Sequence, residues 1–303
     1  MIHFLEHNQI DKTKWNELIY NAHNGLIYAY SWYLDLVCPN WAALVNEDFT
    51  TVMPLPNNKK FGIDYLFPPF FVQQLGVFCL SNFKSQEVDS FIRAIPEKYK
   101  YIEILLNSEN VSLEKKKGIN LNNNLELQLH SNYEFHYKEF SENTRRSIVK
   151  AAKYNLQEVY LESPVPIIDL FRKNRGKGIN NLKDKHYALF KKLCTACSEN
   201  ASIELIGIKE QDQLIAGAVY FIKKNRAIFI FSGTSNQAKQ TRAMFFLIDN
   251  FIKRNAGSGM ILDFEGSNNE NLARFYKGFG ASEKPYPGLK INRLPLLLKN
   301  FKK

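Results

Sequence analysis

Apolar and polar positions follow two different periods in the first half of the chain. Apolar residues at helical spacing follow Asp11, a residue type that caps helices, and a second helical pattern begins at Ser85. Between residues 43 and 71, apolar and polar residues alternate and are interrupted by proline and glycine, which predicts strands joined by turns. The apolar run 101–106 predicts a buried strand. The first half is therefore expected to mix helices and strands around a sheet.

The second half shows the same mixture in a more ordered sequence of elements. Ser141 precedes a basic helix in which Ile148 and Ala151 face a core, and short polar turns separate three strand-like runs that predict an antiparallel meander. The expected elements are, in order, a strand 125–129, helices 143–153 and 184–198, strands 203–209, 214–222 and 226–232, a helix 238–255, a strand 260–264 and a helix 268–278.

A polar stretch between Asn107 and Asn124 separates the two halves. Its low hydrophobicity and turn-forming residues are typical of a connection between domains. We therefore expect two domains, residues 1–124 and 125–303, which also suits a chain of 303 residues. The expected fold class is α/β (α+β), with a mixed central sheet flanked by helices in each domain.

Net charge and the distribution of apolar residues bear on the partners and the cellular location of the protein. The formal net charge is +10, but the lysines are spread along the chain, which favours a solubilising surface over a dedicated surface for RNA, a phosphorylated donor or an anionic membrane. The first residues lack the pattern of a secretory leader, and no apolar run approaches the about 20 residues that cross a bilayer. We expect a cytoplasmic protein with no integral membrane segment.

Several other kinds of site are not supported by the sequence. Cys194 and Cys197 have the spacing of a redox or metal pair, but they share the apolar stripe of one helix with Phe190 and Leu193, which predicts core packing. The histidines show no metal-ligand spacing, and there is no Walker loop and no Gly-x-Ser-x-Gly turn. The sequence predicts reduced thiols and no metal site, and it does not indicate a hydrolase or a nucleotide triphosphatase.

The order of elements in the second half resembles the GNAT superfamily of acyltransferases. Asn269, Leu272, Tyr276 and Gly280 also fall at offsets that many GNAT enzymes share in their last helix. In that superfamily the acyl donor lies between two parallel central strands that splay apart. The resemblance places those strands here at 227–231 and 260–264.

The same resemblance implies where a donor binds. Splayed strands expose backbone groups that can bond an extended donor, and the following helix can turn its amides toward phosphate. Coenzyme A-dependent members usually carry a glycine-rich turn there, whereas no glycine occurs between Ser235 and Phe246, which weakens a coenzyme A donor without excluding it. The donor-binding residues that the resemblance implies are Phe231, Ser232, Lys239, Gln240, Thr241 and Arg242.

A closer resemblance is to the Fem-type aminoacyltransferases, which are tandem GNAT-like proteins. It rests on the run LDFEGSNNENLARFYKGFGA at 262–281 and on NTRRSIVKAAK at 143–153. It implies two GNAT-like domains and an enzyme that takes an aminoacyl group from a transfer RNA and attaches it to an amine of a cell-wall (peptidoglycan) precursor. No counterpart of the helical hairpin insertion that some of these enzymes use is visible in the sequence.

These resemblances imply roles for individual residues. Tyr276 is expected to donate a proton to the leaving group, Glu265 to accept one from the attacking ammonium, and Lys277 to neutralise charge on a carbonyl oxygen or a phosphate. Gly266 would let a substrate approach the backbone. Substrate contacts are expected from Asp263, Arg145, Tyr65 and Gln73, the last two in the aromatic and proline-rich segment of the first half.

The sequence leaves three functions open. The first is an N-acyltransferase that moves an acyl or aminoacyl group to a primary amine, with acyl-CoA or aminoacyl-tRNA as donor substrate and no tightly bound cofactor. The second is an acyl-CoA-dependent GNAT N-acetyltransferase acting on a small molecule or peptide amine. The third is a non-catalytic GNAT-like module that recognises RNA or an envelope precursor. The acceptor amine and the oligomeric state stay open.

Overall fold

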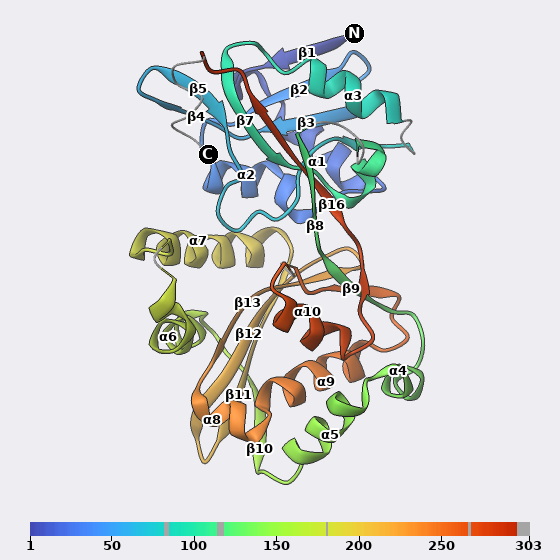
Figure 1. Ribbon diagram of the computed structural model, residues 1–303, viewed down its shortest axis with the longest axis vertical. Helices are drawn as coiled ribbons and strands as arrows, with labels where there is room; N and C mark the ends of the chain where they lie inside the picture. The colour runs from blue at the N-terminus through green and yellow to red at the C-terminus, as the bar shows by residue number, and fades with distance from the viewer. Residues whose placement is uncertain (82–84, 114–117, 180, 266–267, 296–303) are drawn as a thin grey trace. The chain divides into compact units, whose positions relative to one another are not determined.

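The chain forms two compact units (Figure 1). The computed structural model describes residues 1–303 with the exception of 82–84, 114–117, 180, 266–267 and 296–303. Unit 1 comprises residues 1–123 and the segment that begins at Pro285, and unit 2 comprises residues 124–284.

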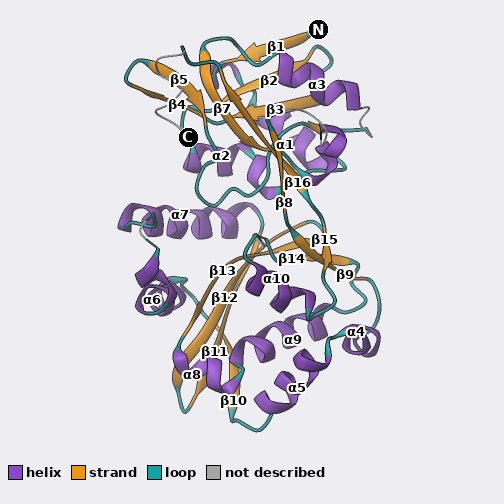
Figure 2. Cartoon of the chain, in the orientation of Figure 1, coloured by secondary structure: helices purple, strands orange, loops and turns teal. Residues whose placement is uncertain are grey.

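Unit 1 is built from two sheets and short helices (Figure 2). Its elements are β1 (Ile2–Leu5), α1 (Lys12–Asn21), α2 (Ser31–Val37), β2 (Ala42–Asn46), β3 (Thr51–Leu55), β4 (Asn57–Lys60), β5 (Ile63–Leu66), β6 (Phe78–Cys79), α3 (Ser85–Arg93), β7 (Tyr99–Leu105), β8 (Ile119–Asn122) and β16 (Tyr286–Asn292). One sheet has the strand order β1-β2-β3-β6 and the other β4-β5-β7-β16-β8, in which β5 and β7 are parallel.

Local sequence signals account for the helices of unit 1. The Asp11 side chain accepts hydrogen bonds from the amides of Thr13 and Lys14, as predicted for a helix cap. Val88 and Phe91 on α3 are buried in a core cluster with residues of β2, β3 and β7. The predicted mixture of helices and strands is therefore found in this unit.

Unit 2 holds a single large sheet. Its elements are β9 (Leu125–Leu129), α4 (Tyr133–Glu139), α5 (Glu142–Ala151), β10 (Leu156–Tyr160), α6 (Val165–Lys173), the short turn η4 (Arg175–Gly178), α7 (Asp184–Asn200), β11 (Ser202–Glu210), β12 (Gln213–Lys223), β13 (Arg226–Thr234), α8 (Asn236–Thr241), α9 (Ala243–Asn255), β14 (Met260–Asp263), α10 (Glu270–Lys277) and β15 (Ser282–Glu283). The seven strands follow the order β10-β11-β12-β13-β14-β9-β15. β11, β12 and β13 pair antiparallel, which confirms the predicted meander.

Helices cover both faces of this sheet (Figure 1). On one face, Phe251 of α9 stacks on Tyr220 with ring centroids 4.1 Å apart. On the other, Phe190 of α7 stacks on Phe221 at 6.1 Å. Since successive strand residues point to opposite faces, the neighbours Tyr220 and Phe221 anchor both helix layers.

Glycines in the sheet let α6 lie unusually close to it. A Cβ at Gly233 would lie 2.9 Å from the Cβ of Leu170 and would collide with the backbone carbonyl of Ile167. Gly217 on the neighbouring strand also lies under Ile167. A helix backbone can approach a strand this closely only where no Cβ intervenes. The approach brings the C-terminal end of α6 beside the C-terminal end of β13.

Two sequence-based expectations differ from the structure in unit 2 and at the chain's end. The predicted helix 238–255 is two helices, because Arg242 has a left-handed conformation (φ 63°) that ends α8 before α9 begins. The segment after Pro285 was assigned to the second domain, but β16 pairs with β7 and β8 and so extends a sheet of unit 1.

The polar stretch 107–124 is also not a simple connection. It contains β8, and Asn107 and Asn110 are buried. Their side chains bond the backbone of Leu75 and Val77, so these two polar residues serve buried hydrogen bonds rather than a solvated connection. Within the described ranges, none of the helices has the length and apolar character needed to cross a membrane.

Candidate functional site

The central parallel strands of unit 2 separate, as the sequence predicted. β13 and β14 pair at only three positions, and the last pair is Ile228 with Asp263. β14 ends at Asp263, whereas β13 continues to Thr234. In the part of the chain that the structure describes, the edge of β13 beyond Ile228 that faces away from β12 therefore has no strand beside it. Such an edge can bond an extended ligand.

An irregularity in β13 lies at the point of separation. Opposite Val219 and Tyr220 on β12 stand Phe231 and Phe229, so Ile230 is an extra residue in the ladder. An extra residue reverses the side-chain alternation. Phe229 accordingly packs on Tyr276 of α10, while Phe231 packs on Phe171 and Phe190 on the opposite face.

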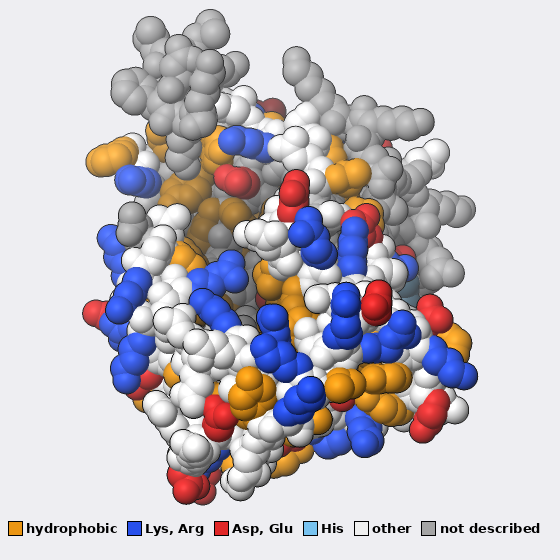
Figure 3. All heavy atoms as spheres, turned by 60° about the horizontal axis from the view of Figure 1, so that its bottom comes forward, with side chains coloured by type: hydrophobic (Ala, Val, Ile, Leu, Met, Phe, Trp, Pro, Cys, Tyr) orange, Lys and Arg blue, Asp and Glu red, His pale blue; other side chains and the backbone are white. Residues whose placement is uncertain are grey.

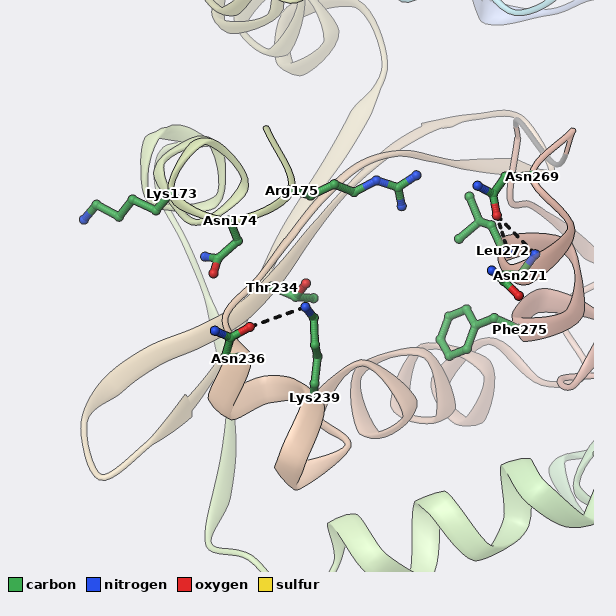
Figure 4. Close-up of a pocket in the computed structure, with 10 residues that line it drawn as sticks. All are labelled: Lys173, Asn174, Arg175, Thr234, Asn236, Lys239, Asn269, Asn271, Leu272 and Phe275. Atoms are coloured by element: carbon green, nitrogen blue, oxygen red, sulfur yellow. Dashed lines mark hydrogen bonds between the residues drawn. The ribbon is translucent and has the colours of Figure 1, made fainter. Parts of the chain in front are cut away.

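A cavity lies at the C-terminal end of β13 (Figure 4). Its volume is about 820 Å³. We call it the β13 cavity; it is lined by Lys173, Asn174, Arg175, Thr234, Asn236, Lys239, Asn269, Asn271, Leu272 and Phe275. The end of α6, the start of α8 and the start of α10 thus surround the free edge of the strand.

The β13 cavity is positively charged. Lys173, Arg175 and Lys239 line it, and no acidic residue is among the described residues that do so. The guanidinium of Arg175 points across the cavity toward Asn269 and Leu272 (Figure 4). Such cations attract an anionic ligand, and an arginine offers phosphate or carboxylate a planar pair of donors.

Tyr276 on α10 is buried and is not among the residues that line this cavity, although its neighbour Phe275 is. Its surroundings are aromatic. Its ring stacks on Phe264 with centroids 4.4 Å apart and meets Phe229 edge-on at 6.1 Å. Burial raises the pKa of its phenol well above the ordinary value, the Glu265 carboxylate adds to the shift, and the Arg175 guanidinium opposes it. Tyr276 therefore stays protonated at neutral pH, the state required of a proton donor.

Glu265 and Asp263 have different surroundings. Asp263 is buried and forms an ion pair with Arg226 at 2.6 Å, and it does not line the β13 cavity. Glu265 lies beyond the end of β14, has a positive φ of 53°, and is half-buried. Its charge acts on Tyr276, which places the two groups in one electrostatic neighbourhood. Gly266, expected to allow close approach of substrate, lies outside the described residues.

The residues that matched the GNAT offsets have clear local roles. The Asn269 side chain caps α10 by accepting hydrogen bonds from the amides of Asn271 and Leu272, both at 3.1 Å. Leu272 lines the β13 cavity. Gly280 has a φ of 83°, a left-handed conformation that favours glycine. Asn269 thus begins the helix that carries Tyr276, whereas Gly280 lies in the turn after its C-cap, Gly278.

The predicted donor-binding residues do not all meet at one place. Lys239 lines the β13 cavity, and Ser232 is half-buried on β13 opposite Ala218. Gln240 and Arg242 are exposed on the α8–α9 bend. Thr241 is buried, and its hydroxyl donates to the carbonyl of Gln237 at 3.1 Å. The structure also buries Phe231 against α6 and α7, away from the cavity.

The remaining predicted residues lie elsewhere. Lys277 is exposed and forms an ion pair with Glu283. The guanidinium of Arg145 on α5 donates to the carbonyl of Lys138 at 3.0 Å. Tyr65 on β5 and Gln73 are half-buried residues of unit 1. Their expected contacts with substrate stay predictions.

The sequence reasoning missed the residues at the end of α6. Lys173, Asn174 and Arg175 line the β13 cavity, although they are far from β13 in the sequence. A signal was present in the run RKNRGKG at 172–178, where cations and glycines follow an amphipathic helix. Its proximity to β13 depends on the close packing of α6 over Gly233, which the sequence pattern does not reveal.

The cysteines and histidines do not form a metal site in the part of the chain that the structure describes. Cys194 and Cys197 are buried on α7, and burial raises the pKa of both thiols. Both lie in the interior, as their place on the apolar stripe predicted.

Comparison with known proteins identifies the fold. No protein-family model and no curated protein matches the sequence. The crystal structure of FemX superposes with a TM-score of 0.68 and 12% identity, over 97% of this chain and 99% of that one. A tandem GNAT protein from the clavulanic acid biosynthesis pathway superposes with a TM-score of 0.57 and 8% identity, over 97% and 99%. The chain therefore has a GNAT/Fem-like fold, and the predicted fold class of two GNAT-like domains is confirmed.

Proposed function

We propose that the protein is an N-acyltransferase whose donor binds in the β13 cavity of unit 2 and whose acceptor is a primary amine. The observation that supports this most is the separation of β13 from β14 beside a cavity lined by three cations. An activated acyl group lying along the free edge of β13 would find unpaired backbone groups for its own polar atoms, while Arg175 and Lys239 would bind its anionic portion.

The proposed chemistry uses few groups. The amine nitrogen attacks the acyl carbonyl carbon and forms the new C–N bond, and the bond from that carbon to the leaving oxygen or sulfur breaks. Glu265 accepts the proton that the attacking amine loses, and Tyr276 donates a proton to the leaving atom. Its raised pKa keeps Tyr276 protonated until that step. Positioning the two substrates supplies much of the remaining rate.

A strip of basic residues bears on the identity of the donor. A second cavity of about 550 Å³ shares Asn271 and Phe275 with the β13 cavity and is lined by Arg274 and Lys277. A third depression of about 410 Å³ lies on the basic face of α5. We call these residues the basic strip: Arg274, Lys277, Arg145, Arg146, Lys150 and Lys153.

The basic strip is continuous in structure. The amide of Ser141, at the start of α5, donates to the carbonyl of Gly278 at the end of α10 at 2.8 Å. A Cβ at Gly278 would meet the Thr144 hydroxyl, so the two helices join closely there. Among the described residues, Glu142 pairs with Arg146 at 3.7 Å and Glu283 with Lys277. Figure 3 shows Lys and Arg side chains across the face where α5 and α8 lie.

This arrangement favours an aminoacylated RNA over acyl-CoA as donor. A polynucleotide carries a row of phosphates that a row of cations can neutralise, whereas coenzyme A carries its phosphates in one short segment. The turn after β13 also lacks the glycines that close on a pyrophosphate. The donor would thus extend from α5 to the β13 cavity, with its acylated end at Tyr276.

Direct measurement of donor binding tests the proposal. Labelled acetyl-CoA, a longer acyl-CoA and aminoacylated tRNA are each titrated against the protein, and transfer to peptidoglycan-precursor amines and small amines is followed. We expect aminoacylated tRNA to bind and its aminoacyl group to be transferred. Binding of acyl-CoA alone would establish a coenzyme A-dependent acetyltransferase, and RNA binding without any transfer would establish a non-catalytic module.

A charge-reversal pair tests the basic strip. Lys150→Glu with Lys153→Glu should weaken RNA binding by about tenfold or more and lessen its salt dependence, because two phosphate contacts are lost. Lys191→Glu with Lys192→Glu makes the same charge change on exposed positions of α7 and serves as the control. Equal losses in both pairs would show that only the net charge acts.

A further inference from the structure

Three charged residues from neighbouring strands meet at the point where β13 and β14 separate. Nη1 of Arg226 on β13 lies 2.7 Å from Oε1 of Glu126 on β9 and 2.6 Å from Oδ2 of Asp263 on β14. Glu126 and Asp263 are almost fully buried, and the Arg226 side chain is 20% exposed. Leaving either carboxylate buried without Arg226 would be strongly unfavourable.

The register of the strands explains why these three side chains contact one another. Ile228 stands opposite Asp263, which stands opposite Glu126 on the other side. Arg226, two residues before Ile228, shares its face of the sheet. The guanidinium therefore spans β13, β14 and β9 on one face, at the last position where β13 and β14 pair.

Asp263 has a second contact that leads toward the candidate site. Its Oδ1, the oxygen not bonded to Arg226, accepts a hydrogen bond from the amide of Glu265 at 3.0 Å. A side chain that bonds the amide two residues later forms a local turn and so restrains the backbone of that residue. Glu265 has such a conformation, with a φ of 53°. A left-handed conformation is unfavourable for a glutamate unless the surroundings hold it.

We infer that Arg226 and Asp263 are positioning residues that hold Glu265 at the site: Arg226 orients the Asp263 carboxylate, and Asp263 binds the Glu265 amide and sets its left-handed turn. The inference rests on the proposed function, in which Glu265 is the proton acceptor. It assigns a role in the reaction to a cluster that does not line the β13 cavity. Asp263 thereby contributes without contacting substrate, in contrast to the contact expected from the sequence.

Two substitutions at Asp263 separate positioning from stability. Asp263→Asn keeps an oxygen that can accept from the Glu265 amide but removes the charge that pairs with Arg226, whereas Asp263→Ala removes both. We expect the Asn variant to melt at a lower temperature and keep kcat within about threefold. We expect the Ala variant to lose kcat by about tenfold or more with donor KM little changed, because a misplaced proton acceptor affects the chemical step.

A double-mutant cycle with Glu265→Gln provides the decisive measurement. If Asp263 acts through Glu265, Asp263→Ala should lower kcat in the native background and have little further effect in the Glu265→Gln background. Additive losses in the cycle, or equal kcat losses in the Asn and Ala variants, would overturn the inference. If Asp263→Ala fails to fold, Asp263→Leu, which also lacks an acceptor for the Glu265 amide but fills more of the buried space, replaces it in the cycle with the same expected outcome.

A matched control uses a second arginine that bridges two carboxylates. Arg254 on α9 pairs with Glu158 and, at 3.4 Å, with Glu204, away from Glu265 in the sheet. Arg254→Lys should lower the melting temperature and leave kcat unchanged. Lack of donor binding and transfer by the native protein would refute the proposed function itself, whereas native transfer with an additive cycle would refute only the positioning role.

Discussion

The two units differ in what lies beside a central parallel strand once its pairing with the next parallel strand ends. In unit 1, β5 is parallel to β7, and further along the chain Leu75 forms a parallel bridge to Leu106. In unit 2, β13 and β14 pair at three positions and then separate beside the β13 cavity. The difference is that unit 1 closes this position with its own side chains, whereas unit 2 leaves it available to a ligand.

Three buried asparagines of unit 1 bond the backbone of Val77. We call Asn24, Asn107 and Asn110 the asparagine cluster. The carbonyl of Val77 accepts from the amides of all three side chains at 2.9–3.2 Å, and the amide of Val77 donates to Asn110 at 2.9 Å. Glycine suits position 76, because Gly76 has a φ of 89° and a Cβ there would collide with the Asn110 side chain. These bonds satisfy both backbone polar groups of Val77 within unit 1.

In the proposed function, this contrast predicts one donor site in the chain, in unit 2. The asparagine cluster supplies partners for the buried backbone groups of Val77 in unit 1. Along the free edge of β13 in unit 2, a bound donor would supply such partners. The predictions below test whether this contrast holds, and they run from the largest expected effect to the smallest.

The largest effect is expected at Tyr276. Tyr276→Phe removes the proton donor and keeps the ring that stacks on Phe264, so kcat should fall by about 100-fold or more with the fold retained. Tyr99→Phe changes a buried tyrosine of unit 1 in the same way and should leave kcat unaltered. Equal activity of the two variants in a steady-state transfer assay would remove Tyr276 from the mechanism.

The next effect concerns the approach of α6 to β13. Gly233→Ala forces α6 away and moves Arg175, so donor affinity should fall about tenfold and the free energy of unfolding by about 1–3 kcal/mol. Gly178→Ala adds the same methyl group where nothing lies within 4 Å of it and is the control. Calorimetric titration with donor and denaturant melts measure both. Unchanged affinity in Gly233→Ala would show that α6 does not shape the site.

A smaller effect on function, but a clear effect on stability, is expected in unit 1. Asn110→Ala leaves the Val77 amide buried without that partner, which should lower the free energy of unfolding by about 1–3 kcal/mol. Donor stoichiometry should stay at one per chain, because unit 2 is untouched. A second bound donor in this variant would show that the asparagine cluster is all that prevents binding in unit 1.

The smallest effect is expected at alkaline pH. Burial raises the pKa of Tyr99 in unit 1 and of Tyr276 in unit 2, so both stay neutral in the fold while the unfolded chain ionises above pH about 10. Their contribution to stability is therefore complete below that pH and is lost as pH rises further. Chemical melts at pH 8 and pH 11 measure the loss, which Tyr276→Phe should reduce in unit 2.

Much of the fold was accessible from residue patterns. The meander of β11, β12 and β13, the caps at Asp11 and Ser141, and the two GNAT-like domains follow from alternation, cap residues and the order of elements. Candidate roles within residues 263–280 could be assigned from the sequence because these residues lie in one continuous segment, and those roles stay predictions. The break between α8 and α9 was missed because a single left-handed residue, Arg242, does not disturb the helical spacing on either side.

The sequence by itself determined the local elements and the segment that carries Tyr276 and Glu265, because helix spacing, strand alternation and capping depend on neighbouring residues. Only the tertiary structure decided which residues join that segment: Arg175 reaches it because α6 packs over Gly233, and Asp263 turns inward because Arg226 and Glu126 meet it across three strands. It also decided that Asn107 and Asn110, at the start of the polar stretch, are buried and bond the backbone of unit 1. Such pairs join residues that are far apart in the sequence. Their contribution to the free energy of folding depends on how deeply they are buried, and a local sequence pattern does not reveal that burial.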